Sequence, residues 1–485
     1  MNICFVANKH LTIYFAEIAG RLEKKAHPVF WLSPSTRWTN WLVAHGTARE
    51  RILNMPDFAL EWTNAKDTTP SPELVALEAP NRPTIANLIL MCRALNRLPK
   101  AKAYAYLEVC QRHIEPFLRR NDIKVCFGEP TWGFELISWM VCRKLGLRYL
   151  HPTTVRIPEK RFAFFDAIPH QVTPYRTVTE EDRSWARTFL AQWRNRPRKP
   201  VLTAQLAAPH IFQSHWHAEL AASWLRHDQD RGDLTLWPMR ARVHSRLKKL
   251  INLLIIGRAS PFSPPVENEP FVLMCLHVQP ENSIDVLGVM HSNQYQAVER
   301  IARLLPATHK LWVKEHPDGL GSRPRTWLKR LGDLPNVRLI DPVYNTFELI
   351  RRAAMVISTT GTVSLEACLL GKSSATLSPI YFSPLLAIDS TKYRDPLDWP
   401  LWETLRNPAS PEVLERKAED YMAWLHAQSF EGMPYDPVTL QHAGRKAADF
   451  DREAEAFASF LAWPDLTRSA IPDKYSNFQE TPPFC

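Results

Sequence analysis

Short apolar runs alternate with amphipathic segments through the first third of the chain. The apolar runs predict buried strands at residues 3–7, 28–32, 123–127 and 147–150. Apolar residues at helical spacing follow two of these runs, at residues 12–22 and 134–145. Because strands that alternate with helices form βαβ units, residues 1–165 are predicted to fold as an α/β domain with a parallel sheet.

The alternation of strands and helices stops after this first domain. Residues 180–193 and 217–226 have helical patterns, and residues 237–256 form a basic segment with a long apolar end. A stretch rich in proline and serine follows at residues 260–270, which is typical of a linker. Residues 166–265 are therefore predicted to be a helical, basic insertion and linker.

A second alternation of strands and helices follows the linker. Strands are predicted at residues 271–276, 311–313, 337–340, 356–357 and 375–377. Helices are predicted at 294–305 and 346–352, and Asn345 is placed to cap the second of them. Residues 266–400 are thus predicted to be a second α/β domain, and residues 401–485 a helical segment that packs back on both domains.

Polar motifs stand directly after two of the strands predicted in the second domain. Lys314-Glu315-His316-Pro317 ends one strand, and Ser358-Thr359-Thr360-Gly361-Thr362 ends another. In open parallel sheets, ligands bind at this carboxyl edge. The hydroxyl-rich turn opens a helix whose backbone N–H groups suit a phosphate, and Glu366, about one helical turn further on, is placed to bind ribose hydroxyls. A purely structural strand-turn-helix is the alternative.

Charged residues also stand at the predicted carboxyl edge of the first domain. Glu129 lies in the turn between a strand and a helix, where a carboxylate is either a partner of the helix terminus or a catalytic base. Arg156 and Arg161 follow a turn predicted at His151-Pro152. Arginines in such a loop either clamp a carboxylate or phosphate with two hydrogen bonds or are solvated charges.

The composition argues against two common kinds of binding site. Among 485 residues, 40 are proline and 15 are glycine, and neither GxGxxG nor GxxxxGK[ST] occurs. The sequence therefore argues against a glycine-rich nucleotide loop. The 8 cysteines form no CxxC pair, so no zinc site is predicted, and free thiols in a reducing compartment are expected. Asp228-Gln229-Asp230 has the letters of a metal motif but follows a helical pattern, which favours a solvated loop.

The net charge of +10 favours anionic partners, such as membrane surfaces, nucleic acids or charged substrates. Because this charge is spread along the chain and no recognised nucleic-acid-reading motif is present, no nucleic-acid partner is predicted. The basic segment 237–256 is either a helix that lies on an anionic membrane surface or an ordinary docking helix. No apolar run is long enough to span a bilayer, so a cytoplasmic protein, peripheral on the inner face of the membrane, is expected.

The order of the motifs resembles a known family. Gln279-Pro280-Glu281, Lys314–Pro317, Asp341-Pro342 and the turn 358–362 with its following Glu-Ala resemble the capsule polysaccharide biosynthesis proteins, which include the bacterial β-Kdo transferases. The resemblance is best over residues 271–380. The motifs are also similar to those of bacterial polysialyltransferases and teichoic-acid glycerophosphotransferases. The resemblance implies the GT-B fold, with two facing Rossmann-like domains and no obligatory metal.

The resemblance also implies roles for single residues. His316 would contact the donor phosphate, and Glu366 would hold the ribose. Glu129 is predicted as the catalytic carboxylate of the other domain from its strand-end position and not from the resemblance. The nucleotide-binding residues would be Lys314, His316, Pro317, Ser358, Thr359, Thr360, Gly361, Thr362 and Glu366. The residues near the sugar or acceptor would be Gln279, Glu281, Arg156 and Arg161.

These expectations describe a metal-independent glycosyltransferase. It would move a sugar, Kdo in particular, from a CMP-sugar to a capsular or other surface polysaccharide or to a lipid-linked primer. The CMP-sugar is a co-substrate, and no cofactor is expected. Two alternatives stay open: a glycerophosphotransferase that uses CDP-glycerol, and a non-catalytic scaffold for envelope assembly with a degenerate nucleotide site.

Overall fold

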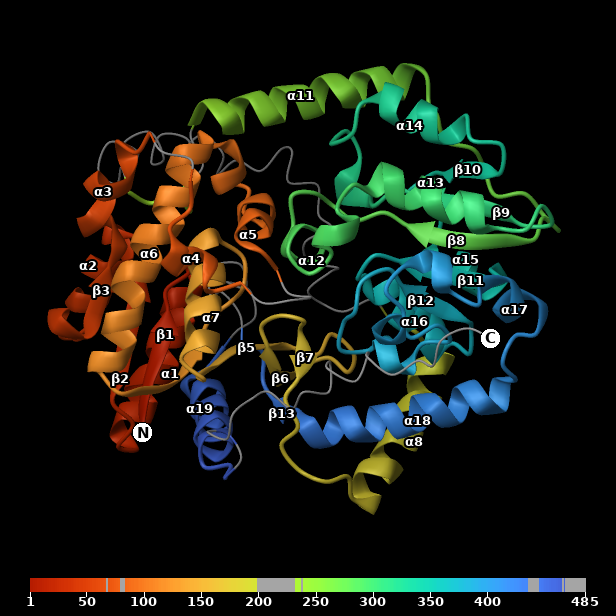
Figure 1. Cartoon of the computed structure of the whole chain (residues 1–485). Coiled ribbons are helices and arrows are strands. Elements are labelled where there is room, and N and C mark those ends of the chain that lie inside the picture. Colours follow the sequence, from red (N-terminus) through yellow and green to blue (C-terminus); the bar gives the residue numbers. More distant parts are fainter. Residues whose placement is uncertain are drawn as a thin grey trace, which may run out of the picture.

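Two sheets, each covered by helices, make up the two halves of the molecule (Figure 1). The computed structural model describes residues 1–66, 69–78, 83–198, 232–236, 239–434, 445–464 and 466. In Figure 1 most of the first half is red to orange and most of the second is green to cyan, while the yellow helix α8 (Glu180–Asn195) and the blue helices α18 (Pro411–Gln428) and α19 (Ala447–Leu461) lie below them. The chain therefore passes from one half to the other and returns.

Five parallel strands form the centre of the first sheet. In spatial order they are β3 (Ile52–Asn54), β2 (Val29–Ser33), β1 (Asn2–Val6), β4 (Ile123–Phe127) and β5 (Arg148–Thr154). Three antiparallel strands extend the sheet beyond β5, namely β6 (Arg161–Asp166), β7 (Gln171–Val172) and β13 (Phe430–Glu431). The register places Phe5 of β1 opposite Trp31 of β2 and Phe127 of β4.

Side chains that alternate along β1 divide the core of this half into two layers. Cys4 and Val6 are buried on one face with α6 and α7, and Ile3 and Phe5 are buried on the other with α1 and α19. Because both faces are covered, the strand is apolar at nearly every position. The helices of this half are α1 (Leu11–Lys24), α2 (Thr36–Ala44), α3 (Ala59–Thr63), α4 (Pro72–Val75), α5 (Ile85–Met91), α6 (Lys100–Arg120), α7 (Gly133–Lys144) and α19 (Ala447–Leu461).

The second sheet has five strands, and all of them are parallel. In spatial order they are β10 (Val337–Ile340), β9 (Lys310–Lys314), β8 (Phe271–Cys275), β11 (Met355–Ser358) and β12 (Ser374–Thr376). The helices between them are α12 (Asn282–Asp285), α13 (Gln294–Leu304), α14 (Arg325–Gly332), α15 (Thr346–Arg352) and α16 (Thr362–Leu369). Asn345 caps α15 as predicted, because its Oδ1 accepts a hydrogen bond from the N–H of Phe347 at 2.9 Å.

In the part of the chain that the structure describes, four helices lie outside the two sheets' own crossovers. They are α8 (Glu180–Asn195), α11 (Met239–Arg258), α17 (Leu401–Arg406) and α18 (Pro411–Gln428). The α18 helix packs against α8 and α16, after which β13 joins the first sheet and α19 packs on α1. The C-terminal segment therefore ties the second half of the molecule back to the first.

The predicted fold class is confirmed, with two facing Rossmann-like domains, helical elements inserted between them and a helical C-terminal segment. The turn predicted at His151-Pro152 is wrong, since both residues lie inside β5. The strand continues because β6 pairs with it as far as Thr154 opposite Phe162. The helix predicted at 217–226 lies outside the described residues. Within the described part of the chain, no helix is both long and apolar enough to cross a membrane.

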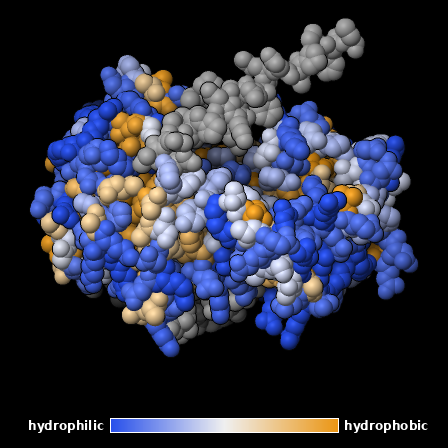
Figure 2. Space-filling view, turned by 90° about the horizontal axis from the view of Figure 1, so that it is seen from below, coloured by the Kyte–Doolittle hydropathy of each residue, from blue (hydrophilic) through white to orange (hydrophobic). Residues whose placement is uncertain are grey.

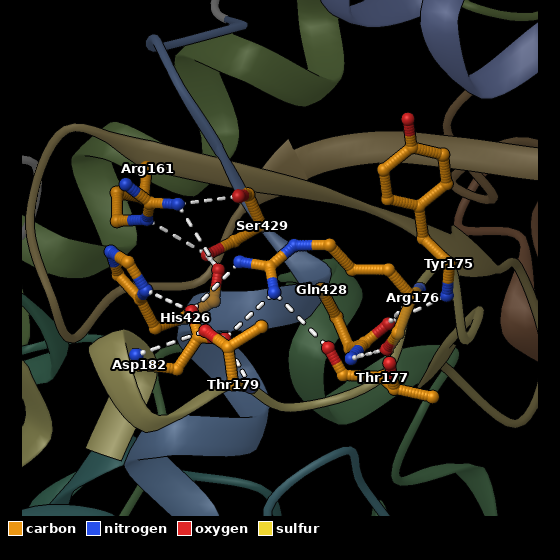
Figure 3. A network of polar contacts seen from close by, with 9 residues as sticks. All are labelled: Arg161, Tyr175, Arg176, Thr177, Thr179, Asp182, His426, Gln428 and Ser429. Carbon is orange, nitrogen blue, oxygen red and sulfur yellow. Dashed lines mark hydrogen bonds and ion pairs between the residues drawn. The ribbon is translucent and has the colours of Figure 1, made fainter.

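A polar network holds the returning C-terminal segment in place (Figure 3). The buried carboxylate of Asp182 accepts two hydrogen bonds from Arg176, each at 2.7 Å, and lies 2.6 Å from Nδ1 of His426 at the end of α18. It also caps α8 by accepting from the N–H of Thr179 at 2.8 Å. These donors, Arg176 first, hold the pKa of Asp182 well below its usual value.

We expect Asp182→Asn to lower the free energy of unfolding by about 2–3 kcal/mol, because Arg176 and His426 lose their anionic partner inside the protein. The matched control is Asp420→Asn, whose exposed pair with Arg183 should leave the unfolding midpoint unchanged. Since the pKa is depressed in the folded protein, the contribution of Asp182 is present above about pH 4 and is lost on acidification below it. Urea titration at pH 7 and pH 3 measures both effects. Equal midpoints for the two variants at pH 7 would contradict this role.

Candidate active site between the two domains

Both sheets have the same strand order, and this order determines where a ligand can enter. Counted along each half, the parallel strands lie in the order third, second, first, fourth, fifth. The first and fourth strands are neighbours whose following segments leave toward opposite faces, which opens a crevice at their carboxyl ends. In the first half this crevice lies at the ends of β1 and β4, and in the second at the ends of β8 and β11.

The two crevices face each other. Asn282, which follows β8, donates from Nδ2 to Oγ1 of Thr131, which follows β4, at 3.2 Å. Desolvation raises the pKa of Glu281, and the positive charges of Arg156 and Arg93 in the first half oppose this rise. The charges of Glu281 and Arg156, both predicted near the sugar or acceptor, therefore interact across the two halves.

Glu129 lies half-buried at the crevice of the first half. Its Oε2 accepts a hydrogen bond at 3.0 Å from Nδ2 of Asn8, which follows β1. The ammonium of Lys9 and the guanidinium of Arg93 lie over the Trp132 ring, 4.4 Å and 4.8 Å from its centroid. The carboxylate is thus held by the neighbouring strand end in a region that carries positive charge.

A different carboxylate serves the terminus of α7. The buried Oε2 of Glu135 accepts hydrogen bonds from the N–H groups of Thr131 and Trp132, at 2.9 Å and 2.8 Å. Burial raises the pKa of Glu135 well above its usual value, and the nearby charge of Glu129 adds to this effect. Of the two alternatives for Glu129, the helix-terminus role is filled by Glu135, and the catalytic role of Glu129 stays a prediction.

His277, at the end of β8, is a site residue that the sequence analysis did not single out. Its Nε2 accepts a hydrogen bond from the N–H of Thr360 at 3.3 Å, which joins the two strands of the crevice. Burial lowers the pKa of His277 to about 4, and the charges of His316 and Arg323 act in the same direction. The ring is therefore neutral at pH 7 and can accept this bond. A polar residue directly after a buried strand is the signal that could have identified it.

A buried ion pair holds the ends of β8 and β9 together. Arg323 donates from one nitrogen to both carboxylate oxygens of Glu315, at 2.5 Å and 2.7 Å, and from its other terminal nitrogen to the carbonyl of His277 at 2.6 Å. Glu315 in turn accepts from the N–H of His316 at 2.8 Å. The Glu315–Arg323 pair therefore positions both histidines of the candidate site.

His316 caps the short helical turn that follows β9 with one of its ring nitrogens. Its Nδ1 accepts a hydrogen bond from the N–H of Asp318 at 3.1 Å, so the proton of the neutral ring lies on Nε2. The side chain is 31% exposed, which leaves it accessible to a ligand. Pro317 begins the short helical turn that this bond caps. Lys314 is buried and donates from its ammonium to the carbonyl of Pro342 at 2.9 Å, and its role toward a nucleotide stays a prediction.

The hydroxyl-rich turn after β11 is shaped by its own side chains. The Ser358 hydroxyl accepts from the N–H of Gly361 at 3.0 Å and contacts the Ser364 hydroxyl at 2.8 Å. Thr360 donates from Oγ1 to the carbonyl of Ser283 at 2.7 Å, and Thr359 is buried. These hydroxyls build the frame of the turn, so a ligand would meet mainly backbone N–H groups at the start of α16.

Thr362 and Glu366 lie together in the first turns of α16. Thr362 donates from Oγ1 to Oε1 of Glu366 at 3.4 Å, and Glu366 is 4% exposed. A carboxylate at this position faces the start of the helix on the same side as Thr362, since the two residues are four apart. This agrees with the predicted place of Glu366 beside the phosphate turn.

Two of the predicted sugar or acceptor residues have structural partners. Gln279 donates to Oδ1 of Asp285 at 2.9 Å and accepts from Nε2 of Gln294 at 2.8 Å, which fixes the loop after β8. Arg161 donates from Nε to the hydroxyl of Ser429 at 2.9 Å and also binds the carbonyls of His426 and Ser429 (Figure 3). These contacts place the Arg161 guanidinium against the C-terminal segment, and its predicted place near the sugar or acceptor stays a prediction. Arg161 begins β6 and holds the segment that leads into β13.

In the part of the chain that the structure describes, no group of three or more His, Cys, Asp or Glu side chains could hold a metal ion. Asp228-Gln229-Asp230 lies outside that part. Six of the seven described cysteines are buried, and Cys275 is partly exposed; all seven are free thiols.

Among known proteins, similarity to this chain is found in solved structures and not in family models or curated proteins. No family model matches the chain, and no curated protein matches it. A UDP-GlcNAc 2-epimerase from Methanocaldococcus jannaschii is 12% identical, with 94% of this chain and 99% of that chain covered and a TM-score of 0.24. The UDP-GlcNAc 2-epimerase from Neisseria meningitidis bound to UDP-GlcNAc is 11% identical, with 95% and 99% covered and a TM-score of 0.24.

A β-Kdo 2,4-transferase from Thermosulfurimonas dismutans is also similar. It is 13% identical, with 61% of this chain and 79% of that chain covered and a TM-score of 0.30. These TM-scores are too low for the likenesses to bear on the function of this chain. A proposal about function therefore rests on the residues of the two facing crevices.

We expect Glu315→Gln to lower the free energy of unfolding by about 3–5 kcal/mol, because the buried Arg323 loses its counter-charge. Replacing both partners, as Glu315→Gln with Arg323→Met, should restore part of this loss because no buried charge remains unpaired. The control is Glu419→Gln, whose pair with Arg187 is more exposed and should have little effect. Urea unfolding followed by circular dichroism measures all three variants. A double variant as unstable as Glu315→Gln would contradict the assigned role.

Proposed function

We propose that this protein is a glycosyltransferase that moves a sugar from a CMP-linked donor, with Kdo as the sugar, to a capsular or other surface polysaccharide or to its lipid-linked primer. The carrying observation is that two crevices face each other, with Glu129 on one side and His277, His316 and the start of α16 on the other. One side can hold a leaving nucleotide while the other activates an acceptor hydroxyl. The resemblance to capsule biosynthesis proteins supports cytidine and Kdo, which the side chains alone do not select.

The nucleotide side offers one compact anion site. The N–H groups at the start of α16 and Nε2–H of His316 would hold the phosphate, because both direct partial positive charge to the crevice. Neutral His277 would support the turn from behind, and Glu366 would accept hydrogen bonds from the ribose. A single site of this size suits a monophosphate and needs no metal to organise it.

The transferred sugar would lie between the halves. Kdo is a sugar acid, so its carboxylate needs a cationic partner, and arginine binds carboxylates well. Arg156 and Arg93 supply positive charge beside Glu281 in this region. In this proposal Arg156 holds the sugar carboxylate, and Glu281 contacts the sugar hydroxyls.

The reaction needs one proton transfer at Glu129. Its carboxylate would take the proton of the acceptor hydroxyl as the acceptor oxygen bonds to the anomeric carbon. The bond between that carbon and the phosphate oxygen breaks, and CMP leaves with the electron pair. His316 and the start of α16 would stabilise the charge on the departing phosphate.

We expect Glu129→Gln to lower kcat by about 10²-fold or more while the Kd for CMP stays the same, because the base is lost and the nucleotide side is untouched. The control is Glu50→Gln, an exposed residue of the first half, which should keep full turnover. Transfer rates, CMP calorimetry and thermal unfolding are measured on the same preparations. A fall in activity that only follows a fall in thermal stability would contradict a catalytic role for Glu129.

Donor identity is tested by calorimetry with CMP, CDP, UDP and GDP in EDTA. CMP should bind at least as well as any diphosphate, and Glu366→Ala should weaken CMP binding through the ribose. His316→Ala should lower turnover by about 10² to 10³ by removing a leaving-group contact. His309→Ala is the matched control, since it lies just before the amino end of β9, whereas His316 follows its carboxyl end.

The same titrations separate the competing functions. Binding that requires magnesium, or a clear preference for UDP or GDP, would reject the CMP donor. Transfer of glycerol phosphate from CDP-glycerol, without sugar transfer, would favour the phosphotransferase. CMP binding without turnover of CMP-Kdo in the presence of oligosaccharide acceptors would favour a scaffold.

A further inference from the structure

The helix α11 lies across the top of the molecule and runs from above the first half to above the second (Figure 1). One face of it is anchored to the second half. Lys249 donates from Nζ to the carbonyl of Asp318, and Asn252 donates from Nδ2 to the carbonyl of Gly321, both at 2.9 Å. Ile256 is buried in the core around β8 and α13. The inner face of α11 therefore rests on the loop that follows His316.

Gly321 permits this close packing. Its φ of +78° is a conformation that favours glycine, and a Cβ built there would lie 2.6 Å from Cγ of Leu253 and 2.9 Å from the carbonyl oxygen of Lys249. Any larger residue would push the helix away from the loop. The position of α11 is thus specified by the fold and is not a chance orientation of a surface helix.

The opposite face of α11 is apolar and exposed. It carries Leu247, Leu250, Ile251, Leu254 and Ile255, whose exposed fractions lie between 45% and 58%. Their spacing places them in one stripe along the helix. At about 100° per residue, Ile256 lies about 180° around the helix from Leu247, so the stripe points away from the anchored face. A continuous apolar stripe directed outward indicates an interaction surface.

Positive charge borders this stripe. The exposed Arg246 and Lys248 each lie about 100° from Leu247, one on either side, and Arg258 ends the helix. Residues 239–258 contain no Asp or Glu. Apolar side chains between flanking cations suit the boundary between the headgroups and acyl chains of an anionic bilayer. A second copy of this chain would bring the same positive flanks against each other in a two-fold pairing, which disfavours a dimer through this face.

We propose that α11 is a membrane-surface helix that docks this protein on an anionic lipid bilayer. The apolar stripe enters the interface, and Arg246 and Lys248 bind lipid headgroups. Because the inner face of α11 is fixed to the loop after His316, docking holds the crevice at a set height above the lipid surface. A lipid-linked acceptor could then reach the crevice without leaving the membrane. The docking itself does not depend on the proposed reaction.

Vesicle flotation of the whole chain, without donor or acceptor, tests the docking. The protein should float with vesicles of phosphatidylglycerol and phosphatidylcholine, should not float with phosphatidylcholine alone, and should be released progressively by salt. Equal flotation on neutral vesicles, or none on anionic ones, would overturn the proposal. Since no turnover is measured, failure here is distinct from failure of the proposed function.

Two pairs of variants locate the contact. Leu250→Ser with Leu254→Ser should lower vesicle binding by about tenfold or more by removing apolar area from the stripe. The matched control, Leu397→Ser with Val413→Ser, removes two apolar side chains that are exposed elsewhere and should bind as the wild type does. The face opposite to α11, which carries α8 and α18, differs from the α11 stripe. Figure 2 shows that this face is mostly hydrophilic, with scattered apolar patches.

Charge is tested in the same way. Arg246→Glu with Lys248→Glu should lower binding to anionic vesicles by about tenfold or more, whereas Arg406→Glu with Arg416→Glu, which changes the net charge equally, should have a much smaller effect. Unchanged circular dichroism and an unchanged midpoint of thermal unfolding show that each variant is folded. Equal losses for the two charge pairs would indicate unspecific attraction and overturn docking through α11. A concentration-dependent dimer that the serine pair in α11 abolishes would assign the stripe to self-association instead.

Discussion

The geometry of parallel strands is the constraint on which this molecule depends. Each parallel pair needs a crossover that packs on one face of the sheet, and the reversal of strand order beside the first strand sends two crossovers to opposite faces. Both halves have this reversal, at β1 and β4 and at β8 and β11. Each half therefore offers an opening only at one edge, and the contact between Asn282 and Thr131 makes those two edges face each other.

Buried carboxylates then give these openings their shape. Glu315 with Arg323 joins the ends of β8 and β9, Glu135 satisfies the terminus of α7, and Asp182 ties α8 to the end of α18. The charges of Glu315 and Asp182, which would be costly alone, are each balanced by several donors. The carboxylate of Glu129 accepts a hydrogen bond from the Asn8 amide at the crevice of the first half, and its catalytic role stays a prediction.

The apolar stripe of α11 and the candidate active site are connected by one loop, which follows His316. The loop after His316 supports the histidine on one side and receives Lys249 and Asn252 of α11 on the other. A lipid surface bound at α11 would therefore lie at a fixed distance from the nucleotide side of the crevice. Under the two proposals, the basic helix α11 and the crevice belong to one enzyme that works beside a membrane.

Periodicity and strand-end position were enough to predict the α/β class, the central strands, the Asn345 cap and the places of His316, the 358–362 turn and Glu129. These features are local, because an apolar run buried on both faces can only be a central strand, and its next residue must lie at the sheet edge. The tertiary structure alone decided that Glu135 caps α7, that His277 joins the crevice, and that Arg161 binds Ser429 and Lys314 binds the carbonyl of Pro342. Each of these roles depends on a partner from a distant or differently directed segment, and sequence spacing does not record which donor and acceptor the fold brings within hydrogen-bonding distance.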